Sequence, residues 1–164
     1  MTPADLECAS LILATFPRAM RTLAHDMRSM QPGQCTMPQY RILGYLYFHG
    51  SDSMGRLAER QGVTLPTMTK MVAGLVERGM VERQVDELDR RVVRLSLTDA
   101  GQSVFETMNE QVKERLAAVV AQMNEPDRAA LIAGLRAFHR IIAAEEAEVN
   151  VPAPAGTRWP ELES

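Results

Sequence analysis

Apolar side chains recur every three or four residues in six stretches of the chain, which is the spacing of an amphipathic helix. The six stretches cover residues 5–30, 38–49, 54–63, 64–79, 98–123 and 124–149. Two shorter runs, 80–85 and 92–97, are rich in β-branched residues and are joined by a polar segment, as the strands of a β-hairpin are. The pattern predicts a mainly α protein with one small β-hairpin, in a single domain over residues 1–150.

The third and fourth helical stretches follow one another with almost no linker. Gly62 ends the first of them, because glycine tolerates the left-handed backbone that redirects a chain. Thr64 is placed to cap the next helix, and Pro66 fits its first turn, where the missing N–H would have no partner. A turn this short sets two helices at a steep angle. With the hairpin that follows, residues 38–98 are predicted to form a winged helix-turn-helix.

The second helix of this pair has two different faces. Met68, Val72 and Leu75 repeat at helical spacing and predict its buried face. The other face carries small hydroxyl groups and one cation, with a proline in the first turn: Thr64, Pro66, Thr67, Thr69 and Lys70. Hydroxyl groups bond to phosphates and to base edges, and lysine adds positive charge. We therefore expect this helix to enter a DNA major groove, a merely solvated polar face being the alternative.

Three segments carry a more specific pattern. They are Pro66-Thr67-Met68-Thr69-Lys70, then Leu75-Val76-Glu77-Arg78-Gly79-Met80-Val81-Glu82-Arg83, then Asp89-Arg90-Arg91 followed by Leu97-Thr98-Asp99-Ala100-Gly101. Together they resemble the multiple antibiotic resistance regulator (MarR) family of bacterial repressors. The pattern Asp-x-Arg followed by Leu-Thr-x-x-Gly is the most specific part of the resemblance, because a generic winged helix does not need it.

The resemblance implies a homodimer without catalytic activity, whose two recognition helices enter successive major grooves of double-stranded DNA. It also implies that an arginine of the wing reaches the minor groove. In this chain that arginine is Arg91, with Arg90 beside it. Asp89 would orient the guanidinium through a charge-assisted hydrogen bond, and a surface ion pair of little energetic weight is the alternative.

The helices outside the winged helix-turn-helix predict the dimer interface. Residues 5–30 and 98–149 are apolar over wider arcs than one small core needs, so we expect them to form a bundle between two subunits. Packing within one subunit is the alternative. Pro17 is expected to bend or strain the first helix near Leu13. The Pro-rich tail, residues 151–164, is expected to be extended.

The charge of the chain is unevenly distributed. The net charge is −3, yet residues 53–94 hold eight lysines and arginines against six acidic residues. A weakly basic DNA-binding region gains from dimerisation, because two copies double the phosphate contacts. No apolar run approaches the ~20 residues that a membrane helix needs. We expect a cytoplasmic protein that does not contact the membrane.

The resemblance also implies a regulatory signal, either a small phenolic or amphipathic effector or the oxidation of a cysteine. The candidate pocket residues are Met37, Tyr40, Gly44 and Tyr47, with Arg21 and His25 as polar partners for an anion. They are core residues in the alternative interpretation. Cys8 is the redox candidate and Cys35 the other thiol, although the acidic residues next to Cys8 disfavour a reactive thiolate.

Two function classes follow from these patterns. The first is a repressor that an effector releases from an inverted-repeat operator, and the second is a winged-helix module that dimerises or positions a partner without binding DNA. An enzyme is not expected, because the sequence has no glycine-rich nucleotide loop and no catalytic constellation. His25, His49 and His139 stand alone, so no metal or other cofactor is expected. A gel shift with genomic fragments distinguishes the two classes.

Overall fold

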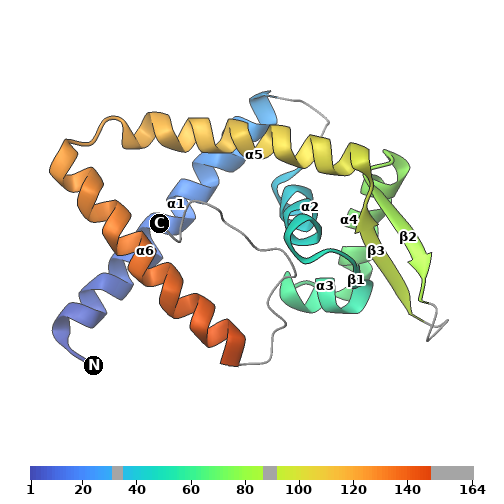
Figure 1. The fold of residues 1–164 in the computed structure, drawn as a ribbon, viewed down its shortest axis with the longest axis horizontal. Coiled ribbons are helices and arrows are strands. Elements are labelled where there is room, and N and C mark those ends of the chain that lie inside the picture. Colours follow the sequence, from blue (N-terminus) through green and yellow to red (C-terminus); the bar gives the residue numbers. More distant parts are fainter. Residues whose placement is uncertain (31–34, 87–91, 149–164) are drawn as a thin grey trace.

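The computed structural model describes residues 1–30, 35–86 and 92–148, with side chains for 1–25, 35–86 and 92–145. The elements follow in the order α1 (Pro3–Met30), α2 (Met37–His49), β1 (Asp52–Ser53), α3 (Met54–Arg60), α4 (Leu65–Glu77), β2 (Val81–Val85), β3 (Val93–Leu97), α5 (Asp99–Val120) and α6 (Glu125–Glu148). The mainly α fold with a small β wing is as predicted. In Figure 1, α5 spans the molecule, α2 to α4 and the sheet lie beneath its N-terminal half, and α6 folds back from its other end.

One apolar core holds the winged helix-turn-helix against the first half of α5. Its fully buried side chains include Ile42, Leu43, Leu46, Leu57, Met68, Val72, Leu75, Val81 and Leu95, and Phe105 and Met108 of α5 close it. Helical spacing over residues 38–49 predicts that Phe48 is buried together with Ile42, Leu43 and Leu46, and for Phe48 this prediction is wrong in part. Phe48 is half-buried, because it lies at the margin of the core and packs edge-on against Phe105 with the ring centroids 5.8 Å apart.

The sheet has one strand more than the hairpin that the sequence predicts. Its order is β1-β3-β2, with both pairs antiparallel, and Asp52 of β1 lies opposite Leu95 of β3. β1 is only two residues long, so it leaves no alternating pattern in the sequence. At the far end of the hairpin the N–H of Asp86 donates to the carbonyl of Val92 at 2.9 Å, which closes β2 on β3.

The helices end at the residues that the sequence singles out. Gly62 and Gly79 have φ angles of 63° and 68°, which favour glycine. Asn124 begins α6 by accepting a hydrogen bond from the N–H of Asp127 at 2.9 Å. α1 runs through Pro17 without a break, although strain was expected near Leu13. The carbonyl of Leu13 loses an N–H partner there, and the residue is 76% exposed, so water can take its place.

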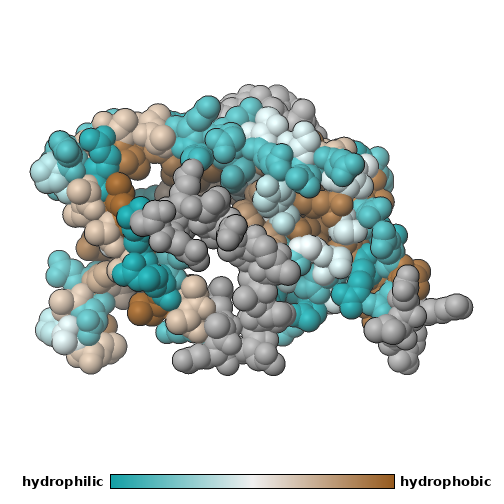
Figure 2. Space-filling model, viewed as in Figure 1, coloured by the Kyte–Doolittle hydropathy of each residue, from teal (hydrophilic) through white to brown (hydrophobic). Residues whose placement is uncertain are grey.

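The two terminal helices carry large apolar side chains that the single chain leaves exposed. They are Leu6, Leu11, Leu13, Phe16 and Met20 on α1, and Leu131, Ile132, Leu135, Phe138, Ile141 and Ile142 on α6. No described side chain of α6 is buried. Figure 2 shows apolar patches along the arm that these helices form. Among the described helices, none is apolar enough over a sufficient length to cross a membrane.

Met68→Ala tests the packing of α4 on the core. Met68 is fully buried, so we expect the free energy of unfolding to fall by roughly 2–5 kcal/mol, since a cavity opens beneath the helix. Thr69→Ala on the exposed side is the control and should stay within about 0.5 kcal/mol of the wild type. Denaturant unfolding measures both, and equal losses in the two variants would contradict the assigned faces of α4.

Candidate nucleic-acid interface

The turn between α3 and α4 is built by backbone hydrogen bonds that place the two helices close together. The N–H of Gly62 donates to the carbonyl of Glu59, and the N–H of Val63 donates to that of Ala58, each at 3.0 Å. Thr64 then caps α4 by accepting from the N–H of Thr67 at 3.4 Å. These contacts leave the N-terminal half of α4 at the surface.

The structure places the five predicted residues of the recognition helix on one exposed end of α4. Thr64, Pro66, Thr67, Thr69 and Lys70 are all exposed, whereas Met68 between them is buried. The hydroxyl of Thr69 donates to the carbonyl of Leu65 at 2.9 Å, which leaves its oxygen able to accept from an amino group of adenine or cytosine. Lys70 makes no ion pair with any residue that the structure describes.

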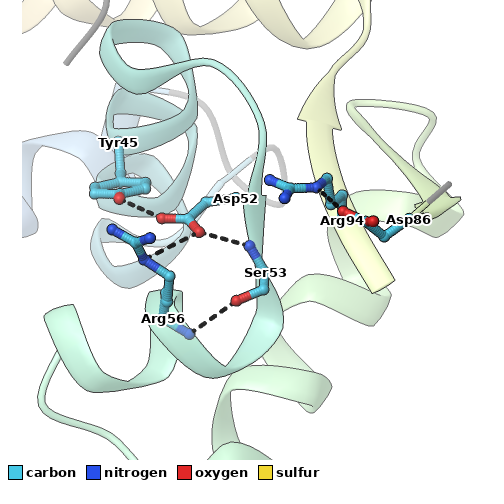
Figure 3. A network of polar contacts seen from close by, with 6 residues as sticks. All are labelled: Tyr45, Asp52, Ser53, Arg56, Asp86 and Arg94. Carbon is cyan, nitrogen blue, oxygen red and sulfur yellow. Dashed lines mark hydrogen bonds and ion pairs between the residues drawn. The ribbon is translucent and has the colours of Figure 1, made fainter. Parts of the chain in front are cut away.

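The wing presents further polar side chains beside α4. Arg83 and Gln84 of β2 are exposed and lie opposite Leu95 and Arg94 of β3. The guanidinium of Arg94 is paired with the carboxylate of Asp86 (Figure 3), so Arg94 is held near the far end of the hairpin. The predicted wing residues Asp89, Arg90 and Arg91 lie outside the described residues.

A hollow of about 450 Å³ lies between the start of α3, α4 and the wing. Its walls are mostly apolar and come from Ser53, Met54, Gly55, Leu65, Thr69, Arg83, Val92 and Val93. The sequence did not single out Arg83, because its position follows only from the pairing of β2 with β3. The hollow brings Thr69 of the recognition helix and Arg83 of the wing to the same surface.

A buried carboxylate joins the elements that support this surface. Asp52 is 7% exposed and accepts hydrogen bonds from the Tyr45 hydroxyl at 2.5 Å and from the Ser53 N–H at 2.7 Å. The Nε of Arg56 lies 3.4 Å from Oδ1 of the same carboxylate and forms an ion pair with it. Figure 3 shows these groups converging from α2, β1 and α3. Sequence analysis missed this network, although the four-residue spacing of Asp52 and Arg56 is a weak signal for an ion pair.

Tyr45 is held as a donor in this network. Its burial, followed by the hydrogen bond to Asp52 and the negative charge there, raises the pKa of Tyr45 to about 12. The ring also stacks on His49, with centroids 4.0 Å apart, and the Arg60 guanidinium lies 5.5 Å above it. The hydroxyl therefore keeps its proton at neutral pH, and Asp52 keeps a partner from α2.

The predicted effector residues lie in three different surroundings. Tyr40, Gly44 and Tyr47 lie together around Phe105 of α5: Tyr40 stacks on that ring at 5.4 Å, and Tyr47 is tilted against it at 4.8 Å. A Cβ on Gly44 would lie 3.0 Å from the same ring. Met37 is half-buried against the core, whereas Arg21 and His25 are exposed on α1.

The two cysteines differ in their surroundings. Cys8 is exposed on α1, and Cys35 is buried against the core. Burial raises the pKa of the Cys35 thiol to about 11, although the nearby Arg78 lowers it in part, so this thiol stays protonated and unreactive at neutral pH. Within the described part of the chain, no cluster of His, Cys, Asp or Glu side chains is arranged to hold a metal ion.

The fold and the exposed polar face of α4 define a winged helix-turn-helix DNA-binding protein, and the comparisons with known proteins agree. The model of the MarR family matches residues 35–92. The HTH-type transcriptional regulator Mb0904 of Mycobacterium bovis is 29% identical over 124 residues, which are 75% of this chain and 87% of that protein. The transcriptional repressor MdtR of Bacillus subtilis is 32% identical over 101 residues, 62% of this chain and 65% of MdtR.

Solved structures show the same fold. Rv1404 of Mycobacterium tuberculosis has a TM-score of 0.71 at 27% identity, covering 87% of this chain and 96% of that one. Wild-type MarR of Escherichia coli has a TM-score of 0.72 at 23% identity, covering 79% and 94%. The chain belongs to the MarR family, and it is a DNA-binding transcriptional regulator rather than an enzyme. Regulators of this family act as dimers.

Tyr45→Phe tests the support beneath the interface. Removing the hydroxyl leaves Asp52 short of one donor, and we expect a loss of about 1–3 kcal/mol in the free energy of unfolding at neutral pH. Because the folded-state pKa of Tyr45 is raised to about 12, its contribution is fully present below pH ~10 and is lost as the pH rises through 12.

Denaturant unfolding of the wild type and of Tyr45→Phe measures this contribution. The measurements run from about pH 8 to about pH 12, the range in which tyrosine side chains titrate. The difference between the two proteins should shrink toward the alkaline end. Tyr47→Phe is the control, since its hydroxyl bonds to Glu106 at the surface rather than to a buried carboxylate. A constant difference across the range would contradict the role of the Tyr45 proton.

Proposed function

We propose that this regulator is a repressor that binds an inverted-repeat operator as a homodimer and leaves it when a small molecule binds. The observation that carries the proposal is the division of the chain into an exposed polar recognition helix and an uncovered apolar pair of terminal helices. The polar face of α4 suits a nucleic-acid partner, and the apolar face of the terminal helices suits a protein partner. A second copy of the chain would cover the apolar face and would bring two recognition helices to one operator.

The apolar stripe on α6 supports the homodimer. Leu131, Leu135, Phe138 and Ile142 follow one another at intervals of four, three and four residues, so they share one face of the helix. All four are more than a third exposed in the single chain. Phe16 of α1 meets Phe138 with the ring centroids 6.4 Å apart. The two helices thus present one apolar surface, which a second copy can cover with its own.

The polar face of α4 and the wing supply the DNA contacts in this proposal. Thr64, Pro66, Thr67, Thr69 and Lys70 lie in the major groove, and Asp89, Arg90 and Arg91 carry the wing to the minor groove. Arg83 extends the contact surface between them, because it shares the hollow with Thr69. An operator in chromosomal DNA places this activity in the cytoplasm.

The proposal of a repressor with an effector draws on the relatives and on the aromatic contact between α2 and α5. MdtR, which is 32% identical, is named a repressor. Tyr40 and Tyr47 join α2 to α5 through Phe105, and their hydroxyls bond to Asn109 at 2.8 Å and Glu106 at 3.0 Å. A phenolic or amphipathic molecule that competes for these contacts would alter how α2 lies on α5. Mass spectrometry of the purified protein under native conditions tests for such a molecule.

Footprinting on an operator with two half-sites tests the binding mode. A two-fold symmetric dimer should prefer half-site centres about one helical turn, roughly 10 bp, apart. Lys70→Ala should weaken binding to all sequences and lower the salt slope by about two, one phosphate contact in each subunit. Thr69→Ala should relax the preference at one position of each half-site.

Binding-site selection with the wild type, Thr69→Ala and Lys70→Ala separates these two effects. Both variants should unfold like the wild type, since both positions are exposed. If both kept the wild-type affinity and sequence preference, α4 would not be the recognition helix. If the wild type itself shifted no genomic fragment, the chain would belong to the class that positions a partner without binding DNA.

Leu135→Asp tests the dimer interface. A charge in the middle of the apolar stripe should convert the dimer to a monomer, because a carboxylate buried between helices has no partner there. Ala133→Asp is the matched control, since Ala133 is exposed on the opposite side of α6. Sedimentation equilibrium measures both variants. A dimeric Leu135→Asp protein would remove α6 from the interface.

A further inference from the structure

The start of α5 is bound directly to the end of the recognition helix. The hydroxyl of Thr98 donates to the carbonyl of Gly79 at 2.6 Å and accepts from the N–H of Gly101 at 3.0 Å. The N–H of Thr98 donates to the carbonyl of Met80 at 3.2 Å. One threonine therefore caps α5 and also ties it to Gly79 and Met80, which follow the C-cap residue of α4.

Gly101 allows this approach because it has no side chain. A Cβ at this position would lie 1.9 Å from the carbonyl oxygen of Met80 and 2.8 Å from its carbonyl carbon. Real Cβ atoms keep at least 3.0 Å, so the two backbones would have to separate by more than 1 Å. The φ of Gly101 is not positive, which means that the need is for space and not for a left-handed conformation. By contrast, a Cβ on Gly134 of α6 would meet nothing within 4 Å.

Both sides of this contact are continuous with functional parts of the molecule. On one side, the N–H of Met80 donates to the carbonyl of Leu75 at 2.9 Å, so Met80 is fixed to the last turn of α4. On the other side, α5 is a single helix of 22 residues. Its first half packs on α2 through Phe105, and its second half exposes Leu116 and Val119 next to α6. Figure 1 shows that α5 alone spans this distance.

We propose that Thr98 and Gly101 are positioning residues that set the separation and angle of the two recognition helices in the dimer. This inference rests on the proposed function, in which the dimer is formed through the terminal helices. The position of each α4 relative to the dimer axis is then fixed where α5 meets Gly79 and Met80. A displacement at that contact moves both recognition helices, one in each subunit. Thr98 and Gly101 thereby determine which half-site spacing the protein accepts.

Gly101→Ala, measured against a series of operators, tests this proposal. The operators carry the same two half-sites with their centres between about 8 and 13 bp apart, and the wild type should bind best near 10 bp. The variant should lose this preference, so that the ratio of its affinities for the best and the next-best spacing falls by at least about three-fold. A loss of folded protein alone lowers the affinity for every operator equally and leaves the ratio unchanged.

Ala100→Gly is the matched control for helix stability. It weakens the first turn of α5 at an exposed position but adds no atom near Met80. It should keep the wild-type ratio, as a purely structural effect would.

Thr98→Asp provides a second variant that does not depend on a steric clash. Aspartate caps a helix as well as threonine does, but an ionised carboxylate cannot donate to the carbonyl of Gly79. The cap is kept and the tie to α4 is lost, so the spacing ratio should fall as it does in Gly101→Ala. Thr98→Ser keeps both hydrogen bonds and should behave as the wild type.

The outcomes separate the two proposals. A wild type that shows no spacing preference contradicts the proposed dimer on an inverted repeat, and the inference falls with it. A wild-type preference that Thr98→Asp and Gly101→Ala both retain overturns the positioning role alone. Should Gly101→Ala fail to fold, the ratio measured for Thr98→Asp against Thr98→Ser decides the question.

Discussion

The burial of Met68, Val72 and Leu75 is the constraint on which the DNA-binding surface depends. Each of these side chains is fully buried, and together they fix the rotation of α4 about its own axis. Because a helix has 3.6 residues per turn, this rotation leaves Thr67, Thr69 and Lys70 no position except the surface. Apolar packing, which is not specific for any ligand, thereby presents the polar groups that are proposed to contact DNA. Changes to the polar face are correspondingly inexpensive for the fold.

Two polar contacts complement the apolar core at places where it ends. Asp52 joins α2, β1 and α3 through Tyr45, Ser53 and Arg56. A buried carboxylate is costly unless it is bonded, so this network constrains the geometry more strongly than apolar contacts of similar area. Thr98 plays the equivalent part between α4 and α5, with two hydrogen bonds from one hydroxyl. The first contact connects elements that follow one another in the chain, whereas the second connects elements that are separated by β2 and β3.

The sequence predicts the elements that local chemistry determines. Thr64, Gly62, Gly79 and Thr98 start or end helices at the expected residues, because caps and left-handed turns act within a few positions. The exposed face of α4 is predicted for the same reason. Three other features are not predictable in this way: the strand β1, the hydrogen bonds of Asp52, and the close approach of Met80 that Gly101 allows. Each of them depends on a partner from another element. The pairing that brings Arg83 beside Thr69 belongs to the same class.

In the proposed dimer, the apolar surface of α1 and α6 makes the stability of the protein a property of two chains rather than of one. No described side chain of α6 is buried, so the helix gains little hydrophobic stabilisation until a second copy covers it, and helices of this kind owe most of their stability to packing. Folding of the terminal helices and association of the subunits are then one equilibrium, which makes the stability depend on protein concentration. Because α5 extends from that interface to the end of α4, the same equilibrium governs whether two recognition helices are presented to DNA together.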